Sequence, residues 1–276
     1  MSTDYSNGMK AAELYICDGD IEEYNTNFYC INLFVKNQKG YHNLCKLTSI
    51  AMTKGYIIKP RINHNILEQY KEGLICLSGA NGEIAKRLSD GDKDGAIEIA
   101  EYYKNLFGED FYISLQETNA QLSELAKELN IKTITATDEI ADKCNFEIES
   151  IKVTNVINAD LIKDIVNWAN EHEIKTGKIC ETPDFSIEID ADRCEQVIDE
   201  YLIPRFSANC IARLEPTDTQ AISLIITPTP IDEIMPVKMS PEGDIVTQYS
   251  KEIIEKMGLS VINFYKIQES CNLVEV

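Results

Sequence analysis

The chain has 276 residues, which is enough for one large domain or two of ordinary size. Its 26 basic and 46 acidic residues give a formal net charge of −20, and this disfavours nucleic-acid binding, which depends on Lys and Arg contacts to phosphates. No apolar run approaches the roughly 20 residues that span a bilayer, and the nine cysteines, without a CxxC pair or an apolar leader, are typical of reduced thiols. We therefore expect a cytoplasmic protein that binds neither membranes nor nucleic acid.

The first half of the chain alternates short apolar runs with amphipathic segments. The runs predict strands at residues 11–17, 28–36, 73–78, 111–116 and 132–137. The amphipathic segments predict helices at residues 41–52, 64–72, 81–89, 92–107 and 119–129. This alternation indicates α/β layering with a mainly parallel sheet.

The pattern changes after Asp138, and we place a domain boundary after residue 143. An extended excursion is expected over 144–155, and the stretch from about 204 to 219 has no clear pattern. The remaining segments predict helices at 158–172 and 251–257 and strands at 185–189, 221–227, 243–249 and 260–267.

Residues 181–201 carry the pattern with the strongest chemical implication. Phe185, Ile187 and Ile189 alternate with polar residues, which predicts a half-buried strand with its carboxylates on one face. Nucleotidyl-transfer enzymes hold two divalent metals with acids arranged in this way. Here the row of acids is interrupted by Ser186.

The order of these segments resembles the alpha subunit of bacterial DNA polymerase III, the C-family replicative polymerase. In the first half, the residues similar to the family's PHP (polymerase and histidinol phosphatase) domain include Leu33-Phe-Val-Lys-Asn-Gln-Lys-Gly-Tyr-His-Asn-Leu and Gly55-Tyr-Ile-Ile-Lys-Pro-Arg-Ile. In the second half, residues 164–177 resemble the palm helix, 182–201 the catalytic strand and helix, and 224–265 the later palm. The resemblance implies a truncated, barrel-derived PHP-like α/β domain over residues 1–143. It also implies a reduced palm-like α+β domain over 144–276, without the fingers and C-terminal modules.

The resemblance implies a PHP metal centre from which most ligands are missing. Glu13 stands at the family's E-x-Y position, while Cys30 replaces a histidine and Ala80 replaces a cysteine. The family's N-D-x-H motif has Glu139 at its acidic position and Ala141 in place of its histidine. One or two ligands cannot hold a catalytic metal, so we expect a PHP-like scaffold without one.

The palm centre implied by the resemblance is depleted in the same way. Of its three metal-binding acids Asp184 remains, whereas Ser186 and Asn263 replace the other two. A hydroxyl and an amide cannot neutralise two Mg²⁺ ions. Glu188 and Asp190, on the face expected for Asp184, are possible substitutes. The family's glycine-rich phosphate loop is deleted, so its backbone N–H groups are lost as well.

Both centres are depleted, but the apolar patterning of the expected strands and helices is intact. This combination predicts a catalytically inactive polymerase-like protein that binds a protein partner, either a component of the replication machinery or a second copy of itself. No cofactor is expected, and Mg²⁺ would be needed only for residual polymerase activity. Two alternatives remain: a residual DNA-directed DNA polymerase using Asp184 with Glu188 or Asp190, and a PHP-type phosphoesterase or exonuclease using Glu13, Cys30 and Glu139.

Overall fold

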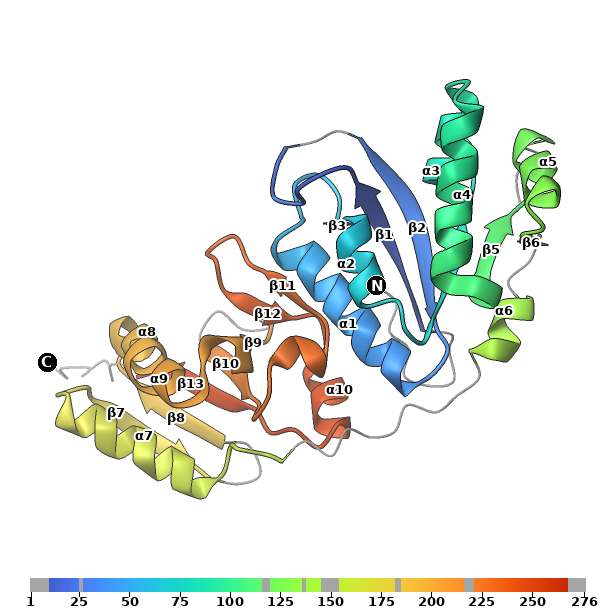
Figure 1. The fold of residues 1–276 in the computed structure, drawn as a ribbon. Coiled ribbons are helices and arrows are strands. Elements are labelled where there is room, and N and C mark those ends of the chain that lie inside the picture. Colours follow the sequence, from blue (N-terminus) through green and yellow to red (C-terminus); the bar gives the residue numbers. More distant parts are fainter. Residues whose placement is uncertain are drawn as a thin grey trace, which may run out of the picture. The chain divides into compact units, whose positions relative to one another are not determined.

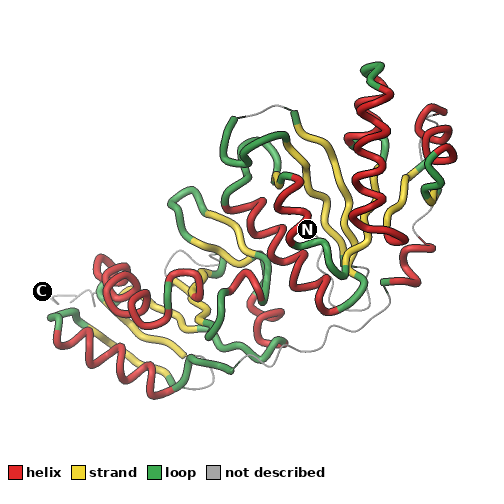
Figure 2. Tube along the Cα trace, in the orientation of Figure 1, coloured by secondary structure: helices red, strands yellow, loops and turns green. Residues whose placement is uncertain are grey.

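The chain divides into two compact units, residues 1–149 and 150–276, in a computed structural model. The structure describes residues 10–24, 27–115, 120–135, 138–144, 154–181, 185–215 and 221–267. Each unit contains one β-sheet with helices packed against it (Figures 1 and 2). Residues 145–150 lie outside the described residues, so the boundary placed after residue 143 stays a prediction.

The first unit is built on a six-stranded sheet in the order β3-β1-β2-β4-β5-β6. Strand β2 runs antiparallel to its neighbours β1 and β4, whereas the pairs β1/β3, β4/β5 and β5/β6 are parallel. The expected mainly parallel sheet is therefore a mixed sheet, and the unit is of mixed α/β type. Its strands are β1 (Ala11–Cys17), β2 (Phe28–Val35), β3 (Arg61–Ile62), β4 (Leu74–Ser78), β5 (Phe111–Ser114) and β6 (Lys132–Ile134).

Several helices of this unit begin at polar residues whose side chains accept hydrogen bonds from free backbone N–H groups. The Asn37 side chain accepts a hydrogen bond from Gly40 N at 3.0 Å, and Asp92 accepts one from Gly95 N at 2.9 Å. Helix α1 packs against β1, β2, β3 and β4, while α3 and α4 pack against each other. The helices are α1 (Gln38–Thr53), α2 (His64–Gln69), α3 (Glu83–Ser89), α4 (Lys93–Phe107), α5 (Ala120–Glu128) and α6 (Asp138–Lys143).

A buried arginine connects the loop after β1 with the loop before β3. The Arg61 side chain is fully buried. Its guanidinium donates to the carbonyls of Ile21 at 2.6 Å, Glu23 at 3.0 Å and Gly55 at 3.2 Å. Because a buried carbonyl is costly to leave without a donor, these bonds fix the course of both loops.

The second unit contains a seven-stranded sheet in the order β11-β12-β9-β10-β13-β8-β7. Strands β8 and β13, which contain Ser186 and Asn263, are parallel neighbours. Strands β7, β9 and β11 were not predicted, because each is short and lacks a clear alternation. The strands are β7 (Thr176–Cys180), β8 (Phe185–Ile189), β9 (Ile211–Arg213), β10 (Ala221–Ile226), β11 (Val237–Met239), β12 (Ile245–Thr247) and β13 (Ile262–Lys266).

One face of this sheet is covered by helices and forms the core of the unit. Ile187 and Ile189 of β8 are buried against Leu161 and Ile165 of α7 and Val197 of α8. The alternation seen in the sequence of β8 is thus confirmed. The helices are α7 (Ala159–Glu171), α8 (Cys194–Val197), α9 (Ile203–Phe206) and α10 (Lys251–Lys256), with a π-helical turn (Ile198–Leu202) between α8 and α9.

Among the described residues, no helix combines the length and the apolar character needed to cross a membrane.

Candidate functional site

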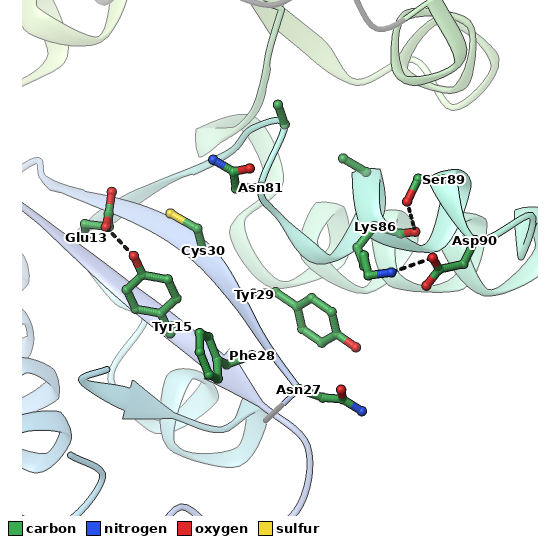
Figure 3. Close-up of a pocket in the computed structure, with 12 residues that line it drawn as sticks. Glu13, Tyr15, Asn27, Phe28, Tyr29, Cys30, Asn81, Lys86, Ser89 and Asp90 are labelled. Carbon is green, nitrogen blue, oxygen red and sulfur yellow. Dashed lines mark hydrogen bonds and ion pairs between the residues drawn. The ribbon is translucent and has the colours of Figure 1, made fainter. Parts of the chain in front are cut away.

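Three of the residues assigned to the depleted PHP centre meet in one pocket of the first unit. Glu13 on β1, Cys30 on β2 and Ala80 after β4 line this pocket, which has a volume of about 670 Å³ (Figure 3). The arrangement follows from the sheet order, because β2 lies between β1 and β4. We call this space the β1–β2 pocket.

The polar groups at one end of the pocket bond to one another. The Tyr15 hydroxyl donates to Glu13 Oε1 at 2.7 Å, and the Cys30 thiol lies near enough to the Glu13 carboxylate for its pKa to be raised by that charge. The hydrogen bond to Glu13, together with burial, raises the pKa of Tyr15 to about 12. Burial and the adjacent Glu13 charge raise the pKa of Cys30 to about 11, so its thiol stays protonated at neutral pH.

The opposite wall of the pocket comes from α3 and the turn that precedes it. Cys30 N donates to the carbonyl of Asn81 at 3.0 Å, which holds this turn against β2. On α3, Lys86 Nζ forms an ion pair with Asp90 Oδ1 at 2.5 Å, and Figure 3 shows this pair on the side of the pocket away from Glu13.

The other two residues assigned to the PHP centre do not complete this cluster. Ala141 is an exposed residue of α6 and carries no ligand atom. The side chain of Glu139 lies outside the described residues, so its predicted role stays a prediction.

The donor set of the pocket does not fit a divalent metal centre. Glu13 and Cys30 are its two possible ligands from the predicted set that the structure describes. Across the described ranges, no three His, Cys, Asp or Glu side chains gather in a way that could hold a metal ion. Zinc and manganese sites in proteins use three or four such ligands.

In the second unit, two of the three residues assigned to the palm centre, Ser186 and Asn263, lie side by side on adjacent strands. Ser186 of β8 is in register with Asn263 of β13. Asn263 is in register with Ser223 of β10, and Ser186 with Cys180 of β7. Residues in register share a face of the sheet, so these four form a polar row across β10, β13, β8 and β7.

Asn263 is bound within this row. Its Oδ1 accepts from the Ser223 hydroxyl at 2.6 Å, and its Nδ2 donates to the Phe185 carbonyl at 3.4 Å. Asn263 itself is buried, with 7% of its surface exposed. The amide therefore connects β13 to the strands on both sides, and its donor and acceptor are both used.

The two possible substitutes are engaged with the backbone. Glu188 Oε2 accepts from Lys178 N at 2.9 Å, where the pairing of β7 with β8 is shifted by a bulge. The Asp190 side chain accepts from Asp192 N at 3.4 Å and caps the turn after β8. Asp184 lies outside the described residues.

A second titratable cluster of the first unit was not expected from the sequence. Glu83 is buried in the first turn of α3. Its carboxylate lies 3.1 Å from His64 Nε2 and 3.0 Å from Arg87 Nη2. His64 Nε2 is also 3.4 Å from the Tyr103 hydroxyl. Burial favours the neutral acid, but the bonds and charges of His64 and Arg87 outweigh it and lower the Glu83 pKa.

Sequence reasoning also missed the aromatic part of the β1–β2 pocket. Tyr15 and Phe28 lie on neighbouring strands with ring centroids 5.5 Å apart and an interplanar angle of 90°. The period-two spacing of Glu13 and Tyr15 could have placed them on one face of β1. The register that brings Tyr15 opposite Cys30 could not be obtained in this way.

Comparison with protein families identifies the class of the first unit. A model of the PHP domain matches residues 8–118, so this part of the chain, which contains the β1–β2 pocket, is a PHP domain.

Comparison with curated proteins shows which PHP proteins are similar. The DNA polymerase III subunit alpha of Borreliella burgdorferi is 30% identical over 236 residues, covering 81% of this chain and 19% of the relative. The corresponding proteins of Deinococcus radiodurans and Aquifex aeolicus are each 34% identical, over 39% and 44% of this chain and 9% and 11% of the relatives. The chain is thus homologous to DNA polymerase III alpha subunits over its PHP region, and it spans about a fifth or less of their length.

Proposed function

We propose that this chain is a replication-linked protein that acts by binding a protein partner and has no active metal centre. The observation that carries this proposal is the donor set of the β1–β2 pocket, where Glu13 and Cys30 are joined by no third side chain that would make a metal-binding group of His, Cys, Asp or Glu among the described residues.

The second unit supports the same proposal. Its assignment as a palm-like domain is supported by the register of Ser186 and Asn263, which lie together as the resemblance to the palm centre predicts. It is also supported by the Borreliella burgdorferi relative, because an alignment over 81% of the chain extends beyond the first unit. In such a domain, the hydrogen bonds of Asn263 replace metal coordination with strand-to-strand contacts.

The nature of the partner follows from homology and charge. The relatives are named as subunits of DNA polymerase III, which favours another component of the replication machinery or a second copy of this chain. The net charge of −20 favours a protein partner over DNA, since the chain would have to overcome repulsion from the phosphates.

The test combines a catalytic measurement with a binding measurement. We expect the purified full chain to show neither primer extension nor nuclease activity with Mg²⁺, Mn²⁺ or Zn²⁺, and to retain no stoichiometric metal after dialysis. We also expect it either to self-associate in sedimentation velocity or to form a complex with purified bacterial replication proteins.

Three outcomes would overturn the proposal. Template-dependent extension that is lost in Asp184→Ala would establish a polymerase. Metal-dependent phosphodiester cleavage that is lost in Glu13→Gln would establish a PHP-type hydrolase. Saturable binding of a primer–template duplex in fluorescence anisotropy, with no protein complex detected, would establish a DNA-binding function.

A further inference from the structure

The β1–β2 pocket combines a carboxylate with aromatic rings. Glu13 lies at the same end of the pocket as Tyr15 and Phe28, and Tyr29 lies between this end and the Lys86–Asp90 pair (Figure 3). Aromatic faces and a carboxylate are the groups that bind organic cations in proteins, through the negative face of the ring and through charge. The volume of about 670 Å³ lies within the range of small-molecule sites, about 300–1,000 Å³.

The charges of the pocket favour a cation over an anion. Lys86 and Asp90 neutralise each other. Glu13 receives a hydrogen bond from the Tyr15 hydroxyl, a neutral donor, and within the described residues it has no ion-pair partner. The aromatic end of the pocket therefore has a carboxylate without an ion-pair partner, and the Lys59 ammonium beside the Tyr15 ring is the cation near it.

One wall of the pocket already lies beside an ammonium group. Lys59 Nζ lies 5.2 Å from the centroid of the Tyr15 ring. This distance is within the roughly 6 Å over which a ring attracts a cation. The contact shows that the environment of Tyr15 accommodates an ammonium, and it also makes Lys59 a competitor for any second cation.

We propose that the β1–β2 pocket binds an organic ammonium or guanidinium group beside Glu13, Tyr15 and Phe28. This inference rests on the proposed function, because a pocket that held a metal would not bind an organic cation at Glu13. The group could belong to a Lys or Arg side chain of the protein partner or to a free polyamine. The shared chemistry is a hydrogen-bonded charge pair with Glu13 and contact with the rings.

The test titrates isotope-labelled full-length protein with spermidine, acetyl-Gly-Lys-Gly-amide and acetyl-Gly-Arg-Gly-amide in 150 mM salt. Binding is followed at the amides of Cys30 and Asn81, which are joined by a backbone hydrogen bond in the pocket wall. We expect saturable shifts with a Kd on the order of 1 mM or tighter, as a charge pair and one or two cation–π contacts would give. Tighter binding of either peptide than of spermidine indicates a protein side chain, and the reverse indicates a free polyamine.

Three variants separate pocket binding from general attraction to an acidic protein. Glu13→Gln is expected to weaken binding about tenfold, whereas Glu124→Gln, which removes the same charge from the exposed surface of α5, is expected to leave it unchanged. Lys59→Met removes the competing ammonium and is expected to tighten binding about two- to fivefold. Equal weakening in the Glu13 and Glu124 variants, or weaker binding in Lys59→Met, overturns the inference.

A zinc titration separates failure of this inference from failure of the proposed function. If 0.1 mM Zn²⁺ shifts the same amides of the wild-type protein and displaces the amines, the pocket is a metal site and both proposals fail. If neither zinc nor amines shift these amides, the inference fails and the proposed function stands.

Discussion

The residues that the sequence assigns to metal centres have different surroundings in the two units. In the first unit, Glu13 and Cys30 line a pocket, and the carboxylate accepts a hydrogen bond from the Tyr15 hydroxyl. In the second unit, the Asn263 amide accepts a hydrogen bond from Ser223 of β10 and donates one to the Phe185 carbonyl of β8. The comparison teaches that residues assigned to similar chemistry can line a cavity in one unit and take part in the packing of a sheet in the other.

The largest effect on stability is expected when carboxylates are introduced at residues 186 and 263 of the second unit. In Ser186→Asp/Asn263→Asp, two carboxylates would lie in register on adjacent strands, and one of them would replace an amide that is 7% exposed. We expect a loss of about 3–5 kcal/mol in the free energy of unfolding when EDTA is present, because a buried charge without a partner is costly.

Divalent cations give this experiment its control. If β8 and β13 keep the geometry of a palm centre, Mg²⁺ or Mn²⁺ restores much of the stability of the double variant and leaves the wild-type protein unchanged. A double variant that is as stable as the wild type in EDTA would show that the row is not closely packed.

The next effect concerns the ion cluster beside the pocket. Glu83→Gln is expected to cost about 2–3 kcal/mol, because it leaves His64 and Arg87 without a buried carboxylate while their own partial exposure reduces the loss. Calorimetry of the variant should show the first unit unfolding at a lower temperature and the second unit unchanged. Loss of stability in both units would contradict this expectation.

The same cluster predicts a dependence on pH. The pKa of Glu83 is lowered in the folded protein, so its stabilising contribution is complete above the ordinary carboxyl pKa of about 4.3 and is lost as the pH falls through the lower folded value. Between these two pH values, the wild-type protein should lose stability more steeply than Glu83→Gln. Parallel curves for the two proteins would show that Glu83 does not titrate in this window.

A smaller effect is expected for the hydroxyl that holds Asn263. Ser223→Ala removes the 2.6 Å bond to Asn263 Oδ1 and should cost about 1 kcal/mol in chemical denaturation. Ser89→Ala is a suitable control, because the Ser89 hydroxyl bonds an exposed carbonyl of its own helix. Equal effects of the two changes would mean that the row in the second unit contributes nothing specific.

The smallest expected effect concerns the alkylation rate of Cys30 in the β1–β2 pocket. With a pKa of about 11, Cys30 is mostly thiol at pH 8, and its alkylation by iodoacetamide should quicken about tenfold for each pH unit until the pH approaches that value. Glu13→Gln removes the neighbouring charge but not the burial, so we expect an increase of only a few-fold at pH 8. Peptide mass spectrometry reports the rate for Cys30 separately from the other cysteines, and an unchanged rate would show that Glu13 does not act on this thiol.

Much of the secondary structure could be predicted from the sequence because hydrophobic periodicity is local. Helices α1, α4 and α7 were placed to within three residues at each end, since their apolar faces and polar caps are visible in the chain. Strand β9 was missed because its three residues form part of the sheet only through pairing with β10 and β12. The bulge between β7 and β8, which engages Glu188, depends on the same kind of long-range register.

The candidate sites were predicted unevenly for a related reason. The motifs that resemble the PHP family assigned Glu13, Cys30 and Ala80 to one site, and these three residues line one pocket. The hydrogen bond that occupies the Asn263 carbonyl comes from Ser223 of a neighbouring strand, and no spacing along the chain reveals it. The buried position of Glu83 was hidden because a carboxylate at the start of a helix is ordinarily exposed.

The buried guanidinium of Arg61 has a consequence for the order in which the first unit folds. Strands β1 and β2 are close in sequence and can pair early. The carbonyls of Ile21 and Glu23 in their connecting loop, however, accept hydrogen bonds from Arg61, which lies about forty residues further along the chain. During synthesis on the ribosome, the loop between β1 and β2 is therefore synthesised before Arg61, and we expect it to take its final conformation only after Arg61 has been added. We expect amide protection to develop along β1 and β2 first and to reach the residues around Ile21 only when β3 has joined the edge of the sheet.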